Sequence, residues 1–355
     1  MSDNAESNNK APDVAVAEAD TAPSHSAPKK GIPVKKPRPV KPQTVAVTGA
    51  TGFVGRHLCR ALTEAGHTVR GIVRSSGPSK ETGSQYAAFE ADLFTPDTLS
   101  AALDGVDACI HLVGIIFEKP DYGQTFERVH VDITQNVVDA CRSHGVKRFV
   151  HMSALGARDS SPARYHRTKY QAEQIVRASG LDWTIIQPSL IHGPDGEFTD
   201  LVAGWARGKK PPFLFMPYFG AGLFGKGREW SIQPVYVQDV AQAFTVALSE
   251  PESIGEVYPL GGPETMTWPE MLCAFRDAIP GGPRRKKAVA IPAWYARTVS
   301  KFMGGAGLGT FLPFNYDQVM MSQEDSTCNV SRVQAHLGID PKPFAEALAE
   351  YVSTL

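Results

Sequence analysis

Three residues near the middle of the chain have side chains and spacing suited to acid–base chemistry: Ser153, Tyr165 and Lys169. Tyr165 and Lys169 stand four positions apart in Arg164–Ser179, whose pattern predicts a helix, so both side chains share one helix face. A cationic lysine beside a tyrosine favours the phenolate and lowers a pKa that is ordinarily about 10. Tyr165 then suits a general acid or base near neutral pH, and Ser153 suits an anchor for a substrate oxygen. We predict these three as catalytic residues.

A glycine-rich turn joins a predicted strand, Thr44–Thr48, to a predicted helix, Phe53–Glu64. Gly49 suits the tight turn, Gly52 a close approach of the backbone to a pyrophosphate, and Gly55 close packing of helix on strand. N–H groups at the start of such a helix hold phosphates, so the turn predicts a dinucleotide site. The residues expected to contact the cofactor here are Gly49, Thr51, Gly52, Phe53, Val54 and Gly55.

The second predicted strand, His67–Val73, is followed by Arg74 and offers no acid. An acid at this place binds the ribose 2′-hydroxyl of NAD, whereas an arginine accommodates the 2′-phosphate of NADP. We therefore predict NADP(H), with Arg74 on the 2′-phosphate and Arg70 as the alternative. Two alternatives stay open: Arg74 is only a solvated charge at the end of the strand, and the cofactor is NAD(H).

Strands and helices alternate up to Pro188, which predicts an α/β fold with a Rossmann-type, doubly wound parallel sheet. Beyond Pro188 the regular alternation of strands and helices ends. We expect residues 43–189 plus 233–261 to form the NAD(P)-binding Rossmann domain, and 190–232 plus 262–355 a smaller, discontinuous substrate domain. The further predicted elements are Tyr86–Ala91, Pro96–Leu103, Asp107–Val113, Thr125–His144, Lys147–Met152, Trp183–Gln187, Val235–Leu248 and Glu256–Leu260.

The composition is that of an ordinary globular protein: 355 residues, 42% hydrophobic, 21% charged, and a net charge of −1 that disfavours nucleic acid as a partner. Five cysteines without a CxxC pair predict reduced thiols and no metal site. No apolar run reaches the roughly 18 residues of a membrane span. We expect a cytoplasmic protein, with peripheral contact at the inner face of the membrane as an alternative, and we predict no oligomeric state.

Residues 1–42 differ from the rest because they contain no Leu, Phe, Tyr or Trp. Such a segment cannot bury enough apolar surface to offset its ordering entropy, so we expect a disordered tail. Its second half is rich in Lys and Pro, which suits an extended linker or a weak tether to an anionic surface.

The GxxGxxG spacing after Thr48, with the Tyr165-xxx-Lys169 pair and Glu173, resembles the extended and atypical branches of the short-chain dehydrogenase/reductase superfamily. The resemblance implies that Lys169 also bonds the nicotinamide ribose. It further implies cofactor contacts by Asp92, Leu93, Val113, Gly114, Lys169 and Pro188.

Two residues depart from the family pattern. Gln187 stands where extended members carry Arg, and His130 where many carry Asn, which counts against a sugar-nucleotide epimerase or dehydratase. His130 is either a packed helix histidine or a proton relay.

Further stretches resemble bacterial proteins similar to the NADPH-binding accessory subunit of respiratory complex I: Arg148–Gly156, Ile232–Ala241 and Pro313–Val319. That resemblance implies NADPH binding, a link to quinones and contact with a membrane or a respiratory complex. The aromatic-rich segment Pro211–Phe224 suits either a lid over the cofactor or an apolar mouth for a quinone or lipid-like substrate.

Three functions follow as hypotheses. The first is an oxidoreductase that passes hydride from NADPH to a small carbonyl or quinone-like substrate. The second is a sugar-nucleotide epimerase or dehydratase. The third is a non-catalytic NADPH-binding sensor or assembly subunit.

Overall fold

The computed structural model describes residues 41–74, 86–280, 285–305 and 314–355, so the predicted tail lies almost wholly outside it. The chain divides into two units, Met1–Ile32 and Pro33–Leu355, and everything below belongs to the second. The predicted division of that unit into a Rossmann part and a smaller substrate part stays a prediction.

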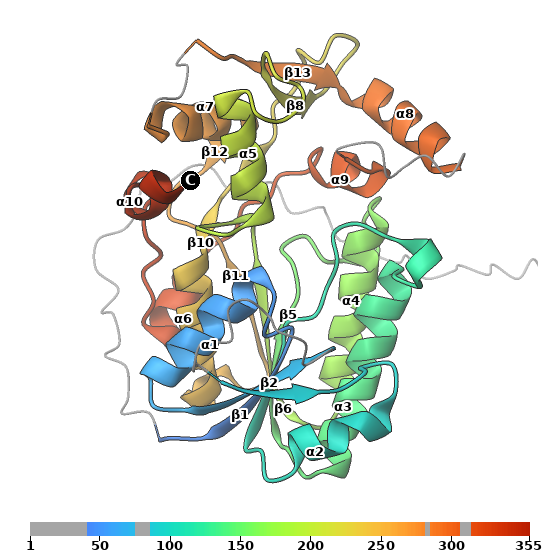
Figure 1. Cartoon of the computed structure of the whole chain (residues 1–355), viewed down its shortest axis with the longest axis vertical. Helices are drawn as coiled ribbons and strands as arrows, with labels where there is room; N and C mark the ends of the chain where they lie inside the picture. The colour runs from blue at the N-terminus through green and yellow to red at the C-terminus, as the bar shows by residue number, and fades with distance from the viewer. Residues whose placement is uncertain (1–40, 75–85, 281–284, 306–313) are drawn as a thin grey trace, which may run out of the picture. The chain divides into compact units, whose positions relative to one another are not determined.

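A seven-stranded sheet forms the centre, in the order β11-β6-β5-β4-β1-β2-β3, and every neighbouring pair is parallel. This order confirms the predicted doubly wound Rossmann-type fold (Figure 1). The strands are β1 (Thr44–Thr48), β2 (Thr68–Val73), β3 (Ala87–Glu90), β4 (Ala108–His111), β5 (Arg148–Met152), β6 (Asp182–Pro188) and β11 (Glu256–Leu260).

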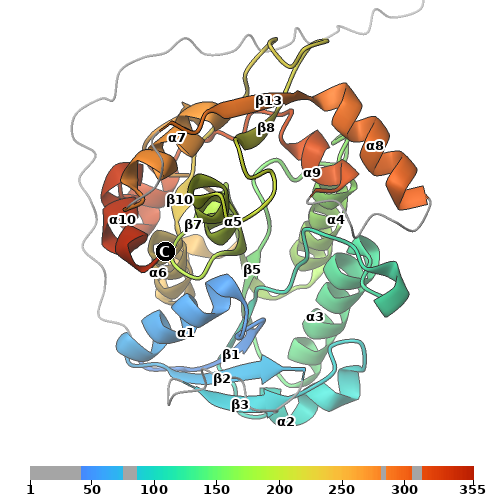
Figure 2. The same ribbon diagram turned by 45° about the horizontal axis from the view of Figure 1, so that its top comes forward.

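Helices cover both faces of this sheet, because its strands alternate apolar side chains between two cores. In β1, Val45 and Val47 join one cluster and Ala46 joins the other. Helices α1 (Phe53–Glu64) and α6 (Val237–Ser249) pack on the first face. The opposite face carries α2 (Ser100–Leu103), α3 (Ile133–Ser143) and α4 (Arg164–Ala178) (Figure 2).

The predicted helix Thr125–His144 is interrupted. Glu127–Asp132 forms a π-helical turn, and α3 continues from Ile133. The wider turn holds His130 between Ile115 and Thr168, which a uniform 3.6-residue pattern could not predict.

Three small strand pairs lie outside the main sheet, at the carboxyl ends of its strands. They are β7 (Ile191–His192) with β10 (Val235–Tyr236), β9 (Ser231–Ile232) with β12 (Met266–Thr267), and β8 (Met216–Gly220) with β13 (Ala288–Pro292). The helices of this region are α5 (Glu197–Arg207), α7 (Trp268–Ala278), α8 (Ala293–Gly305), α9 (Tyr316–Met321) and α10 (Phe344–Tyr351). Short turns complete the described elements: 3₁₀ turns at Pro96–Leu99, Pro120–Tyr122, Pro251–Ser253 and Val352–Thr354, and a π turn at Val333–Leu337.

Arg148, at the start of β5, ties the sheet to α6 from within the core. Its guanidinium is buried, and burial lowers its pKa to about 10, so it stays charged at neutral pH. It donates to five acceptors at 2.5–3.2 Å: the carbonyls of Asp182, Ala247 and Leu248, and the hydroxyls of Thr184 and Ser253. Removing the donor would take one hydrogen bond from each of these buried acceptors.

We expect Arg148→Met to lower the free energy of unfolding by about 3 kcal/mol, because several buried acceptors each lose a hydrogen bond. Urea unfolding followed by circular dichroism measures the change. Arg142→Met is the control, since that side chain is 60% exposed, and should change stability by under about 0.5 kcal/mol. Equal effects of the two substitutions would contradict a stabilising role for the buried hydrogen bonds of Arg148.

Candidate active site

The glycine-rich turn has the shape that a dinucleotide needs. Gly49 adopts φ +74°, and its carbonyl accepts a hydrogen bond of 3.0 Å from the Gly52 N–H. A Cβ added to Gly55 would lie 2.1 Å from the Gly49 oxygen, so any larger residue would push α1 away from β1. The open backbone of the turn fits a pyrophosphate at the start of α1.

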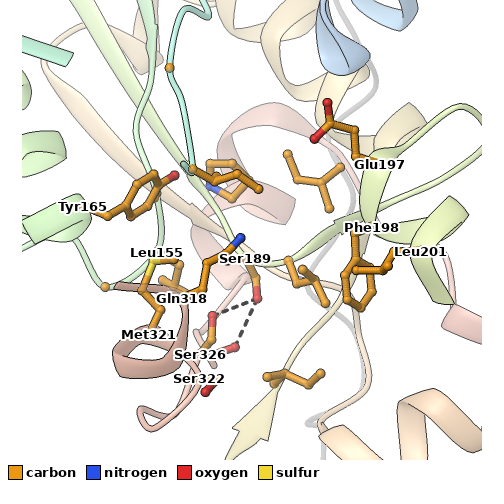
Figure 3. Close-up of a pocket in the computed structure, with 18 of the residues that line it drawn as sticks. Leu155, Tyr165, Ser189, Glu197, Phe198, Leu201, Gln318, Met321, Ser322 and Ser326 are labelled. Atoms are coloured by element: carbon orange, nitrogen blue, oxygen red, sulfur yellow. Dashed lines mark hydrogen bonds between the residues drawn. The ribbon is translucent and has the colours of Figure 1, made fainter. Parts of the chain in front are cut away.

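A cavity of about 720 Å³ opens next to this turn, where the strands end and the outer helices begin. Eight predicted site residues line it: Thr51, Gly52, Phe53, Gly114, Ser153, Tyr165, Lys169 and Pro188. In Figure 3, Tyr165 and Leu155 stand on one side of the cavity and Phe198 and Leu201 on the other. The structure therefore brings the turn and the three predicted catalytic residues to one space.

Seven other predicted contacts are not among the lining residues: Gly49, Val54, Gly55, Arg74, Asp92, Leu93 and Val113. Gly49 and Gly55 shape the turn through their backbone, and Val54 and Leu93 are buried in the core. Arg74 is exposed at the end of β2. A dinucleotide is long enough to reach beyond one cavity, so these residues stay predicted contacts.

Asp92 has local partners. Its carboxylate accepts from the Phe94 N–H at 3.0 Å and from the Thr95 hydroxyl at 3.2 Å, which makes it the start of a loop turn. Arg70, the alternative to Arg74, is also engaged. It donates to the Asp104 carbonyl at 2.6 Å and lies 5.3 Å from the Phe89 ring centroid.

Lys169 is buried, and its ammonium donates to the carbonyl of Met152 at 2.6 Å. Burial lowers the pKa of Lys169 to about 8, against the opposing charge of Glu173. The Ser153 hydroxyl is also buried and has no hydrogen-bond partner in the protein. An unsatisfied hydroxyl facing a cavity suits a ligand oxygen.

The expectation that Lys169 lowers the pKa of Tyr165 is wrong for the protein without bound cofactor or substrate. Burial raises the pKa of Tyr165 to about 12, and no cation offsets this. The ring packs edge-on against Phe126 and His130, with centroids 5.8 and 5.4 Å away, and Lys169 is committed to Met152. Tyr165 therefore holds its proton at neutral pH.

His130 is a packed, neutral histidine. One ring nitrogen lies 2.9 Å from the Thr168 hydroxyl, and the other accepts from the Ile115 N–H at 3.1 Å. Burial, followed by the charge of Lys169, lowers its pKa well below the ordinary range. Because both nitrogens have partners, His130 positions the wall behind Tyr165.

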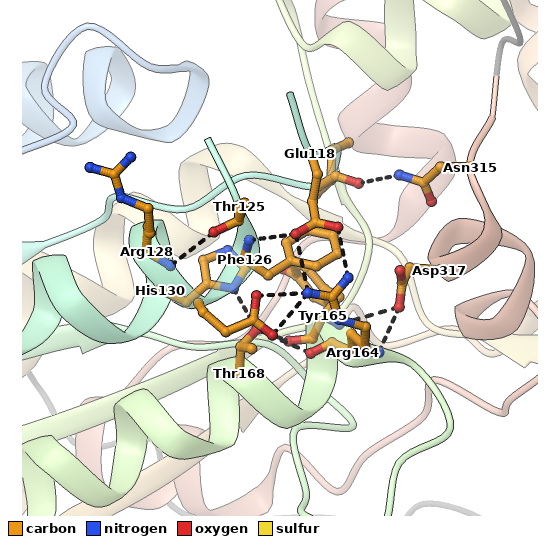
Figure 4. A network of polar contacts seen from close by, with 12 residues as sticks. Glu118, Thr125, Phe126, Arg128, His130, Arg164, Tyr165, Thr168, Asn315 and Asp317 are labelled. Carbon is orange, nitrogen blue, oxygen red and sulfur yellow. Dashed lines mark hydrogen bonds and ion pairs between the residues drawn. The ribbon is translucent and has the colours of Figure 1, made fainter. Parts of the chain in front are cut away.

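The first turn of α4 is held from outside, as Figure 4 shows. Its N-cap is Ala163, which has no side chain to cap with. Asp317 of α9 accepts from the N–H groups of Arg164 at 2.6 Å and Tyr165 at 3.4 Å. Glu118 and Glu127 pair with the Arg164 guanidinium. These contacts fix the helix turn that carries Tyr165.

Comparisons with known proteins agree with this geometry. A family described as NAD(P)H-binding matches residues 49–208. The mitochondrial NADH dehydrogenase [ubiquinone] 1 alpha subcomplex subunit 9 of Arabidopsis thaliana is 32% identical over 249 residues, 68% of this chain but only 59% of the plant protein. The NAD(P)H azoreductase of Xenophilus azovorans is 29% identical over 251 residues, 70% of this chain and 77% of the azoreductase.

The solved structures show the same fold. The NADPH-dependent quinone oxidoreductase of Escherichia coli, complexed with NADPH, superimposes with a TM-score of 0.65 at 22% identity, covering 87% of this chain and 99% of that one. The chain contains an NAD(P)H-binding region and is similar to these relatives, and its fold is the one that short-chain dehydrogenases/reductases share.

Two parts of this site were not predicted from the sequence. Arg56, on α1, lines the cavity and donates to the Thr51 carbonyl at 2.9 Å. The outer wall is apolar and comes from segments far apart in the chain: Phe198, Leu201, Trp205, Phe219, Trp268, Leu272, Ile291, Phe314 and Met321. Arg56 follows Gly52 by four residues, one helical turn, so its place near the glycine-rich turn could have been predicted from the sequence. No local sequence pattern predicts the residues of the apolar wall.

The buried charge of Lys169 has a cost that Lys169→Met should relieve. The change of pKa from 10.5 to about 8 corresponds to about 3 kcal/mol. Below pH 8 that cost is fully present. It fades between pH 8 and 10.5, because there the unfolded chain holds a proton that the folded chain has lost. We expect the variant to gain about 1–3 kcal/mol in free energy of unfolding at pH 7, and the gain to shrink toward pH 10.

Urea unfolding at pH 7, 9 and 10 measures this gain. Lys147→Met is the matched control, because Lys147 is exposed and its removal should change little at any pH. A loss of stability at pH 7 in Lys169→Met would mean that the bond to Met152 outweighs the desolvation of the ammonium.

Proposed function

We propose that this protein is an NADPH-dependent reductase of an apolar carbonyl or quinone-like substrate. The observation that carries the proposal is the cavity in which Ser153, Tyr165 and Lys169 meet the cofactor turn, with the Ser153 hydroxyl buried and without a partner.

Ser153, Tyr165 and Lys169 each have a separate role in the proposed reaction. When bound, NADPH supplies a hydride, which carries two electrons. Ser153 donates a hydrogen bond to the substrate oxygen, and Tyr165, which holds its proton at neutral pH, gives that proton to the same oxygen. Hydride and proton together turn a carbonyl into an alcohol, or a quinone into a hydroquinone. Lys169 orients the cofactor ribose, and solvent returns the proton to Tyr165.

The substrate's apolar character follows from the wall opposite Tyr165. Phe198, Leu201 and Trp268 line the cavity, and such a wall favours a ring or chain without charge. The named relatives accord with this, since one is an azoreductase and another a subunit named for ubiquinone.

Two further proposals concern the cofactor and the cellular place. NADP(H) is preferred because Arg74 is exposed at the end of β2 while Arg70 is bound to Asp104. The protein acts in the cytoplasm, and contact with the inner face of a membrane or with a respiratory complex accords with relatives that are named as mitochondrial ubiquinone-linked subunits. No helix of the described residues is long and apolar enough to cross a bilayer.

One finding favours a second function, a non-catalytic NADPH-binding subunit or sensor. The Tyr165 pKa is raised to about 12 and Lys169 is bonded to Met152, so Tyr165 is a weak proton donor without help from a neighbouring cation. Such a protein would hold NADPH without oxidising it.

A stopped-flow experiment separates the two functions. Protein preloaded with NADPH is mixed with a panel of quinones and apolar carbonyls, and cofactor fluorescence is followed. We expect Tyr165→Phe to slow oxidation at least about 100-fold, because the proton donor is lost. The control is Tyr170→Phe, one residue beyond Lys169 on α4 and not among the lining residues, which should oxidise NADPH at the wild-type rate. Tight NADPH binding without oxidation by any acceptor would favour the subunit or sensor.

Arg74→Ala tests the cofactor preference. Loss of a charge-assisted bond to the 2′-phosphate should raise the NADPH dissociation constant about 10–100-fold and leave that of NADH unchanged. Fluorescence titration measures both constants. Arg60→Ala, another exposed arginine, serves as the control and should alter neither. Tighter binding of NADH than of NADPH by the wild-type protein would refute the preference.

A further inference from the structure

Large exposed apolar side chains are concentrated in two segments of the outer region. Of the twelve in the described part of the chain, eight lie in residues 208–228 and 285–303. Leu214 is 85% exposed, Phe302 75% and Phe224 74%. We call these eight residues the outer apolar surface: Phe213, Leu214, Leu223, Phe224, Val289, Trp294, Tyr295 and Phe302. Such clustering on a soluble fold marks an interaction site.

The two segments are neighbours in space. Strand β8 pairs with β13, and the Trp294 indole donates to the Leu223 carbonyl at 3.1 Å. Phe302 follows Tyr295 by seven residues on α8, so both lie on one face of that helix. Figures 1 and 2 both show β8, β13 and α8 side by side. The residues of the outer apolar surface therefore lie on neighbouring elements.

The same segments carry an excess of positive charge, although the whole chain has a net charge of −1, and the exposed Glu229, which interacts with Tyr218, is the acid next to them. Residues 208–228 and 285–303 contain no Asp or Glu. Their cationic residues are Lys209, Lys210, Lys226, Arg228, Arg285, Lys286, Lys287, Arg297 and Lys301. Arg228 pairs with Asp325 and Lys286 bonds two carbonyls, while the exposed cations include Lys226, Lys287 and Lys301. Aromatic side chains rimmed by lysines match the interface of an anionic bilayer.

The elements that carry the outer apolar surface also form the wall of the cavity. Pro217 and Phe219 of β8, and Ile291 of β13, line the cavity from within. A molecule that leaves a bilayer at the outer apolar surface would meet the apolar end of the cavity across a single pair of strands.

We propose that the outer apolar surface rests on an anionic lipid bilayer, where the site takes up its apolar substrate. This inference rests on the proposed function for the identity of the substrate, but the surface itself is argued from exposure and charge. The contact is peripheral: aromatic side chains enter the headgroup region, and the lysines pair with anionic headgroups.

Vesicle sedimentation tests the proposal with the full chain. Large vesicles of phosphatidylcholine alone, and of phosphatidylcholine with phosphatidylglycerol, are mixed with wild-type protein and with the double variant Leu223→Ser/Phe224→Ser. We expect binding to the anionic vesicles that weakens as salt is raised, and a loss of about tenfold or more in the double variant. Lys226→Glu should weaken binding mainly at low salt.

The matched control is Tyr122→Ser, which removes an aromatic side chain that is 80% exposed elsewhere on the protein and should bind as the wild type does. Thermal unfolding shows whether the variants are folded, and Phe302→Ser replaces the double variant if that one is not. The proposal would be overturned if the wild-type protein did not bind anionic vesicles or bound neutral vesicles equally well. It would also be overturned if the substituted protein bound anionic vesicles as well as the wild type does. So would light scattering that shows the surface joining two copies of the chain.

The outcome is separable from that of the proposed function. A water-soluble short-chain quinone is reduced without any membrane, so its turnover should be unchanged in Phe302→Ser, a residue that does not line the cavity. Turnover without vesicle binding would refute the proposed membrane contact and leave the proposed reductase function standing. Vesicle binding without oxidation of NADPH by any acceptor would overturn the reductase instead.

Discussion

One buried cation governs the polar interior of this fold. The ammonium of Lys169 is withdrawn from solvent and bonded to a strand carbonyl, and its charge reaches His111, His130 and His151. The pKa of each histidine is lowered first by its burial and then by Lys169, and that of His111 falls to about 3. The Lys169 ammonium is therefore surrounded by neutral imidazoles. Its preferred ligands are groups that offer oxygen lone pairs to that charge.

The sheet and the cofactor turn were predictable because their signals are local. The interval from Gly49 to Gly55 combines tight-turn geometry with a contact that leaves no room for a Cβ, and both lie within seven residues of sequence. Apolar strands of four to seven residues, most of them followed by a helical pattern, indicate a parallel sheet. Tyr165 and Lys169 were predictable from a four-residue spacing on one helix.

The rest of the site depends on contacts between distant segments. Asp317 caps a helix turn 153 residues away, and Arg148 bonds carbonyls about 100 residues away in α6. No spacing rule links such pairs. The raised pKa of Tyr165 also depends on distant segments: its cause is burial, and the i, i+4 rule, which places Lys169 on the same helix face, contains no information about burial. Local rules locate the residues, and tertiary contacts decide their protonation.

Helix α9 gives the site a built-in coupling. One residue of that helix, Asp317, holds the N–H groups at the start of α4, while its neighbours Gln318 and Met321 line the cavity. A ligand that orders α9 thereby also stabilises the helix turn carrying Tyr165, and by thermodynamic reciprocity a well-positioned Tyr165 strengthens the binding of that ligand. In the proposed reductase, the binding of the substrate's remote end and the placement of Tyr165 are thus coupled. Selectivity for that end of the substrate would then affect the rate of the chemical step as well as affinity.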